Sequence, residues 1–163
     1  EPVNDDVIGE LRNRVYFDEL TGYYTYWHKV IPATGQNNNE RFATQFAPAG
    51  FTGTAGWSFS DALGVGLPND ATAFEITLTD ENFIRWNTIN GGADWDQLER
   101  IKFFYVSTKA PGSPTSGLYN LTGTEVGTGA SYAPTPEPGS MLLLGSGLAA
   151  LYGARRRRNQ KVQ

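Results

Sequence analysis

The sequence contains no cysteine and only one histidine, His28, among its 163 residues. The absence of cysteine excludes disulfides, thiolate nucleophiles and cysteine-based zinc sites. With a single histidine, and no Gly-x-Ser-x-Gly sequence around any serine, the chain offers no evident triad for nucleophilic hydrolysis. We expect His28 to lie on an aromatic strand face, with metal ligation or general-base catalysis as the alternative role.

Positive charge is scarce before the C-terminal tail. Residues 1–154 hold eight basic against seventeen acidic residues, a net charge of −9, and the other five basic residues lie within 155–161. Proteins that bind nucleic acid do so largely by neutralising phosphates with lysine and arginine. We therefore expect no nucleic-acid partner for the acidic part of the chain.

Long amphipathic helical patterns are missing before the tail, whereas glycine and proline recur throughout, with 19 and 9 residues. Short aromatic or β-branched runs between such turn residues favour an all-β domain. In the clearest run, Phe74, Ile76 and Leu78 alternate with polar residues, and in another Ile101, Phe103 and Tyr105 share one face. We expect about seven to nine short strands in an antiparallel β-sandwich, with the jelly roll as one variant.

Two segments between these runs carry local signals of their own. Residues 47–56 are rich in turn formers and are expected to be a turn rather than a strand. Residues 79–82 read Thr-Asp-Glu-Asn, which predicts the cap of one helical turn that continues to Trp86.

The last thirty residues form three blocks in a fixed order. Three prolines between 134 and 138 predict an extended spacer, and the sixteen residues 139–154 carry no charge. As a helix this uncharged block would rise about 24 Å, against a hydrocarbon core of about 30 Å, so it predicts a short, marginal membrane span. Four arginines follow, at Arg155, Arg156, Arg157 and Arg158. Because arginines resist translocation, they should stay cytoplasmic while the preceding domain lies outside.

This order of blocks resembles the PEP-CTERM sorting signal of bacterial surface proteins, through Pro136, Glu137, Pro138, the Leu/Gly run and the arginine cluster. The resemblance covers only the tail. It implies that exosortase, a membrane-embedded cysteine protease, cuts near Pro-Glu-Pro and that the protein is then released or attached in the extracellular polymer layer. Export implies a signal peptide, which we expect to have been removed or to lie before this numbering. An ordinary C-terminal anchor with a stop-transfer cluster is the alternative.

The expected organisation follows from these signals. Residues 1–133 should form an extracellular β-sandwich domain, 134–138 a Pro-Glu-Pro linker, 139–154 a single short transmembrane helix, and 155–163 a basic cytoplasmic tail. The tail predicts export to the cell surface or extracellular matrix, with transient anchoring in the cytoplasmic membrane. It carries no information on what the domain does there.

Carboxylates offer a further set of candidate sites. Asp94 and Asp96 lie beside an Asn-Gly-Gly turn and could bind a structural calcium ion, which prefers several oxygen ligands; no other cofactor is expected. The same pair, or the pairs Asp18/Glu19 and Asp80/Glu81, could in principle cleave glycans as acid and base. Solvated surface charge is the alternative for all of them.

Aromatic side chains supply the main binding hypothesis, because sugar rings stack on aromatic faces. The candidates are Tyr24, Tyr26, Trp27 and Trp95; the alternative is that these rings fill the core. The sequence thus leaves three functions: a non-enzymatic structural or adhesive surface protein of a biofilm matrix, a carbohydrate-binding module in the exopolysaccharide layer, or a glycan-cleaving enzyme. Buried tryptophans would favour the first and exposed ones the second.

Overall fold

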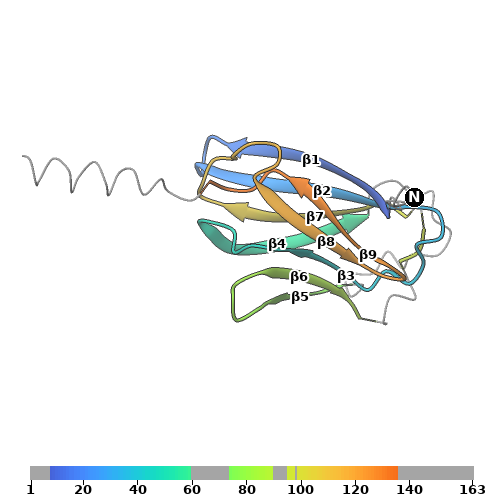
Figure 1. Ribbon diagram of the computed structural model, residues 1–163. Coiled ribbons are helices and arrows are strands. Elements are labelled where there is room, and N and C mark those ends of the chain that lie inside the picture. The colour runs from blue at the N-terminus through green and yellow to red at the C-terminus, as the bar shows by residue number, and fades with distance from the viewer. Residues whose placement is uncertain (1–7, 60–73, 90–94, 98, 136–163) are drawn as a thin grey trace, which may run out of the picture.

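The computed structural model describes residues 8–59, 74–89, 95–97 and 99–135 (Figure 1). These residues form nine β-strands and no helix, which confirms the all-β prediction. The predicted helix at 139–154 lies outside the described residues. Within the described part of the chain, no helix has the length and apolar character needed to cross a bilayer.

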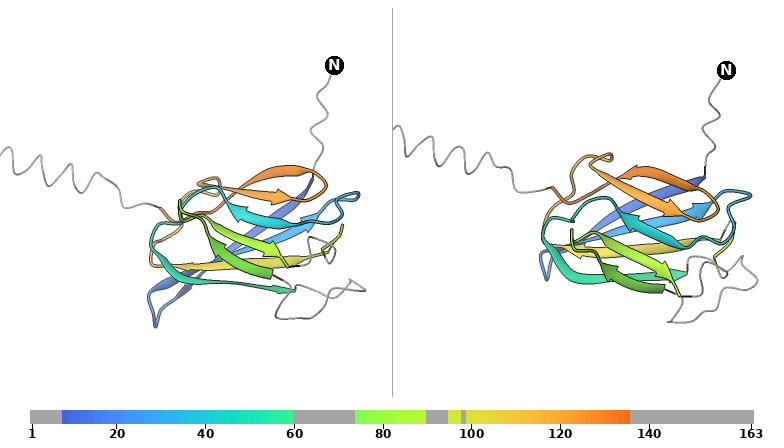
Figure 2. Two further views of the ribbon diagram at one scale, coloured as in Figure 1. Left: turned by 90° about the horizontal axis from the view of Figure 1, so that it is seen from below. Right: turned by 60° about the horizontal axis from the view of Figure 1, so that its bottom comes forward.

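The strands form two antiparallel sheets, which lie one over the other in Figure 2. The four-stranded sheet has the order β1 (Gly9–Asp18), β2 (Tyr23–Pro32), β7 (Ile101–Ser107), β4 (Phe51–Phe59). The five-stranded sheet has the order β5 (Phe74–Leu78), β6 (Ile84–Thr88), β3 (Arg41–Thr44), β8 (Gly117–Thr122), β9 (Val126–Ser131). Consecutive strands form the hairpins β1–β2, β5–β6 and β8–β9.

Aromatic rings from both sheets meet in one core, with Phe103 of β7 at its centre. The Phe103 ring lies 4.8 Å from the ring of Phe42 and 5.2 Å from that of Phe74, centroid to centroid. It also contacts Trp86 at 5.6 Å and Trp95 at 5.4 Å. Because β7 is an interior strand of its sheet, the predicted inward face of this strand is fully buried.

The other alternating strand is only partly buried. Phe74 is in the core as predicted, but Ile76 is 37% exposed and Leu78 is 52% exposed. Their register opposite the buried Trp86 and Ile84 puts them on the inward face of the five-stranded sheet. β5 is the edge strand of that sheet, so these two side chains are covered less than those of an interior strand.

Two local expectations were wrong. Residues 79–83 form the turn of the β5–β6 hairpin, where Thr79 N–H donates to Phe83 O at 3.0 Å and Asn82 has a φ of +61°. The Thr79 hydroxyl oxygen accepts a hydrogen bond from Phe83 N–H, so it stabilises the hairpin turn instead of capping a helix. The segment that reaches Trp86 is strand β6. Residues 51–56, expected in a turn, belong to β4, because pairing with β7 outweighs the local turn composition.

Contacts with the β domain continue as far as Thr135, the last described residue. Pro134 forms a bridge with Pro111, and Thr135 N–H donates to Ala110 O at 3.0 Å. Ala133 is buried and its carbonyl accepts from Gly112 N–H at 2.9 Å. The first two residues of the linker expected over 134–138 are therefore in contact with the loop that follows β7.

Candidate functional site

The outward face of the four-stranded sheet gathers basic and aromatic side chains. Alternation along β1 turns Arg12, Arg14 and Tyr16 outward, while the register pairs Arg12 with Lys29 and Arg14 with Trp27. On the next strand Lys102 lies opposite Lys29. The β1–β2 hairpin and the sequence-distant strand β7 thus bring basic side chains to one surface.

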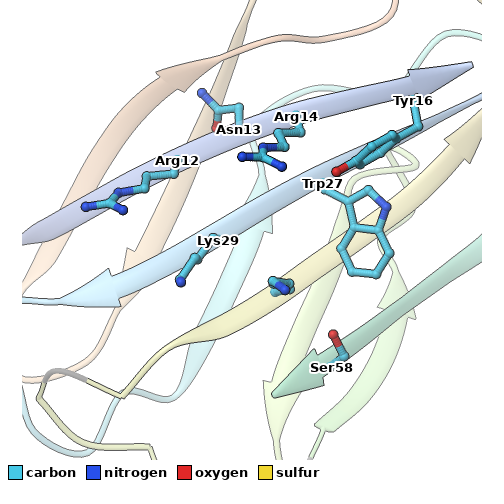
Figure 3. A pocket seen from close by; sticks show the side chains of 8 residues that line it. Arg12, Asn13, Arg14, Tyr16, Trp27, Lys29 and Ser58 are labelled. Carbon is cyan, nitrogen blue, oxygen red and sulfur yellow. The ribbon is translucent and has the colours of Figure 1, made fainter. Parts of the chain in front are cut away.

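These side chains line a pocket of about 530 Å³ on the sheet (Figure 3). Its lining comes from four strands and consists of Arg12, Asn13, Arg14, Tyr16, Trp27, Lys29, Ser58 and Lys102. Four of the eight lining residues are cationic and none is acidic. The pocket is therefore a positively charged groove on a domain whose net charge is negative.

One carboxylate lies at the margin of this groove. Arg12 Nε donates to Glu10 Oε1 at 2.5 Å, and Arg12 Nη2 donates to Glu10 Oε2 at 2.9 Å. The hydrogen bonds from Arg12, with the nearby charges of Lys29 and Arg100, hold the pKa of the Glu10 carboxyl below its usual value. Both side chains are more than half exposed, so this ion pair adds little to stability and leaves Arg12 accessible.

Trp27, which lines the groove on β2, packs against Phe104 on β7. The rings of Trp27 and Phe104 lie 4.6 Å apart at an angle of 35°. The Phe104 ring extends over β4 at Gly56, where a Cβ atom would come within 2.3 Å of the ring. A side chain at residue 56 would displace this ring, so the packing of Phe104 beside Trp27 depends on glycine at that position.

The four predicted sugar-stacking residues separate into two groups. Tyr26 and Trp95 are fully buried, and Tyr26 stacks on Tyr105 in the core at 5.0 Å, so neither presents a ring face to a ligand. The reason is register: Tyr26 occupies an inward position on β2, whereas Trp27 points outward. Trp27 and Tyr24 are half-buried, and only Trp27 lines the groove.

His28 lies in the core beside the rings of Phe42 and Tyr119. Its Nδ1 is 3.2 Å from Ser131 Oγ, and its buried Nε2 has no hydrogen-bond partner among the described residues. Burial lowers the pKa of His28 to about 3, so the imidazole is neutral at physiological pH. Across the described residues, no three acidic or histidine side chains gather as they would around a metal ion.

The predicted carboxylate sites have local roles where they can be described. Asp96 Oδ1 accepts from Asn38 N–H at 3.1 Å, which ties the segment before β7 to the loop before β3. Asp94 lies outside the described residues, so calcium at this pair stays a prediction. Asp18 caps the β1–β2 turn, where its carboxylate accepts from Leu20 N–H at 2.9 Å and from the Thr21 hydroxyl at 2.8 Å.

The basic residues of the groove were missed as a site by reading the sequence alone. The signal available was a period of two: Arg12, Arg14 and Tyr16 alternate on one run, and Trp27 and Lys29 on another. That period places residues on faces but does not tell which strands are neighbours. The β1–β2–β7 pairing, which joins Lys102 to the group, is a property of the tertiary structure.

Comparison with known proteins identifies the tail. Residues 134–158 match the family model of the PEP-CTERM protein-sorting motif. No curated protein matches the chain. The chain thus carries a sorting motif after an all-β domain. The motif implies processing by exosortase, a membrane protein, and a location at the cell surface or outside the cell.

The arginine cluster gives a direct test of how the motif works. Changing Arg155, Arg156, Arg157 and Arg158 to serine should let the apolar block slip through the membrane, because the charge that resists translocation is gone. We expect less processed protein in an exosortase-containing host, measured as intact mass in the membrane and released fractions. A variant trimmed and sorted like the parent would show that the arginines do not stop transfer.

Proposed function

We propose that this protein is a non-enzymatic, adhesive component of the bacterial surface or biofilm matrix that holds an acidic polysaccharide in the groove of its four-stranded sheet. The observation that carries the proposal is charge: residues 1–154 hold eight basic and seventeen acidic residues, and four of the eight basic residues line one pocket. Four positive charges close together, with no carboxylate in the lining, create a positive potential that attracts an anionic ligand.

The chemistry of the lining suits an anionic sugar chain in particular. Arginine forms paired hydrogen bonds with carboxylate and sulfate groups. Arg14 could offer them to a uronic acid, whereas Arg12 already donates such a pair to Glu10. The half-exposed Tyr16 and the ring of Trp27 supply apolar surfaces for the C–H faces of a sugar. An open sheet face accommodates a long polymer better than an enclosed cavity would.

A purely structural role is the second candidate. The burial of Trp86 and Trp95 supports it, because these rings stabilise the core and are not free to bind. The glycan-cleaving enzyme has less support: the described groove lining holds no acid–base pair, and the Asp18 carboxylate is engaged in a turn.

Two further parts of the proposal concern architecture. The two sheets share one aromatic core, which supports a β-sandwich, although the β1–β2 and β8–β9 hairpins depart from the interleaved order of a jelly roll. Residues 139–154 anchor the chain in the cytoplasmic membrane until exosortase cuts near Pro136–Pro138, with residues 155–163 in the cytoplasm.

Binding of the full chain to polygalacturonate and to neutral dextran tests the groove. We expect binding to polygalacturonate that weakens with added salt, and none to dextran. The double change Arg14→Gln and Lys102→Gln should weaken binding about tenfold, since each exposed ion pair contributes up to about 1 kcal/mol. Trp27→Ala should also weaken binding, through loss of the stacking surface.

Arg85→Gln is the matched control, because Arg85 is an exposed arginine on the outward face of the five-stranded sheet. It removes the same charge from the other side of the domain and should leave binding unchanged. Equal weakening by Arg85→Gln would mean that net charge, and not the groove, determines affinity. No binding to polygalacturonate by the parent would refute polysaccharide adhesion and favour the structural role.

A further inference from the structure

The turn of the β1–β2 hairpin exposes large apolar side chains, of which only Tyr16 also lines the groove. Leu20 is 97% exposed and Phe17 is 53% exposed, and Tyr16 and Tyr23 are also largely accessible. We call residues 16–23 the hairpin tip. Its exposed rings and the Leu20 side chain lie beside the two carboxylates of Asp18 and Glu19.

The hairpin tip has a defined conformation. Gly22 adopts a φ of +72°, and its N–H donates to Asp18 O at 2.8 Å. The Asp18 side chain accepts two hydrogen bonds within the same turn, which hold the pKa of its carboxyl below the usual value. Hydrogen bonds within the turn therefore fix the backbone from which the exposed Leu20 side chain projects.

The hairpin tip lies at the end of the domain where the described chain finishes (Figures 1 and 2). Just after the turn, β2 pairs with the last residues of β7, and Tyr26 Oη donates to Lys109 O at 2.9 Å. The next residue, Ala110, accepts from Thr135 N–H. A short run of contacts therefore joins the hairpin tip to Thr135, the last described residue.

The sequence beyond Thr135 limits how far this end can be from a membrane. Only three residues separate Thr135 from Gly139, where the uncharged block starts. Four residue steps span at most about 14 Å even when fully extended. While residues 139–154 are in the bilayer, the domain end that carries the hairpin tip must lie close to the membrane surface.

We propose that the hairpin tip inserts into the interface of the membrane that holds the tail, and leaves it when the tail is cut; this rests on the proposed anchoring. Tyrosine, phenylalanine and leucine favour the boundary between headgroups and acyl chains. The carboxylates of Asp18 and Glu19 keep the insertion shallow, at headgroup depth. The partner is thus a lipid surface, and contact with the protease in place of lipid is an outcome that the test separates.

The absence of cysteine makes the test specific, because Leu20→Cys accepts a single environment-sensitive dye. The labelled full chain is mixed with phosphatidylcholine vesicles that contain lipids spin-labelled near the headgroup, and only protein that floats with the vesicles is measured. Val126→Cys is the matched control. Val126 is also an exposed aliphatic residue, at 66%, and starts β9 at the opposite end of the domain from the hairpin tip (Figure 1).

We expect the dye at residue 20 to be quenched at least about twofold more than the dye at residue 126. Adding Phe17→Ser to the labelled Leu20→Cys chain should reduce this quenching, with a melting curve to show that the domain stays folded. Equal quenching at both positions, or quenching of residue 20 only when exosortase is present, would overturn insertion into lipid. Quenching that does not change with Phe17→Ser would also overturn insertion into lipid. The signal would then be explained by the tether, which holds the dye near the vesicle surface. Failure to float would refute the anchoring itself, and the insertion with it.

Discussion

Replacing Phe103 with alanine should lower the free energy of unfolding by about 3–5 kcal/mol. Phe103 has no exposed surface, and its ring contacts three aromatic rings of the opposite sheet, Phe42, Phe74 and Trp86, together with Trp95 from the segment before β7. Truncation removes the transfer free energy of the ring and leaves a cavity between rigid neighbours that cannot collapse onto it. Because a domain is stable by only about 5–15 kcal/mol, this change should move the urea midpoint strongly or unfold the protein.

Substitutions at two other positions provide the comparison for the Phe103 variant. Phe104 points to the other face of the same strand, is half-buried and packs on Trp27, so Phe104→Ala should cost about 1 kcal/mol. Thr77→Ala removes one hydrogen bond, from Asn87 Nδ2 to Thr77 Oγ1 at 3.2 Å, and should cost about 1 kcal/mol or less. A mild Phe103 variant beside a severe Thr77 variant would mean that the faces of the sheets are reversed.

Stability should also fall steeply as pH decreases from 7 to 5, and His28 is the cause. Burial lowers the pKa of His28 to about 3 in the folded protein, whereas the unfolded chain has an ordinary value of about 6.5. Between these two values the unfolded state binds a proton that the folded state does not. The free energy of unfolding should therefore decrease by up to about 1.4 kcal/mol per pH unit below 6.5, a loss of about 2 kcal/mol at pH 5. Above pH 7 the effect vanishes, because the imidazole is neutral in both states.

His28→Phe provides the comparison, since phenylalanine is planar and does not titrate. The variant leaves Ser131 Oγ without the imidazole, so the slope of stability against pH is compared and not the absolute value. The carboxyls of Glu10 and Asp18, whose pKa values are lowered in the fold, lose their contribution only at lower pH. Urea midpoints between pH 7 and 5 should decline for the parent and stay nearly flat for His28→Phe. A flat parent curve would show that His28 is hydrated or protonated in the folded state.

Much of the strand content could be read from residue patterns. The period of two along 101–107 identified both the strand and its buried face, because an interior strand exposes one side to the core along its whole length. The same reasoning was only partly successful at 74–78. It placed Phe74 correctly, but it could not know that β5 is an edge strand where Ile76 and Leu78 are less covered.

The sequence by itself determined the all-β class, the inward face of β7 and the sorting motif of the tail, because each depends on the order of neighbouring residues. Only the tertiary structure decided which aromatic rings are accessible: Tyr26 and Trp27 are adjacent in sequence, yet one is in the core and the other in the groove. It also assembled the cationic surface, by placing Lys102 beside Lys29, and brought the hairpin tip to the end of the domain that holds Thr135. Strand pairing joins residues across more than seventy positions, and local alternation carries no information about such long-range register.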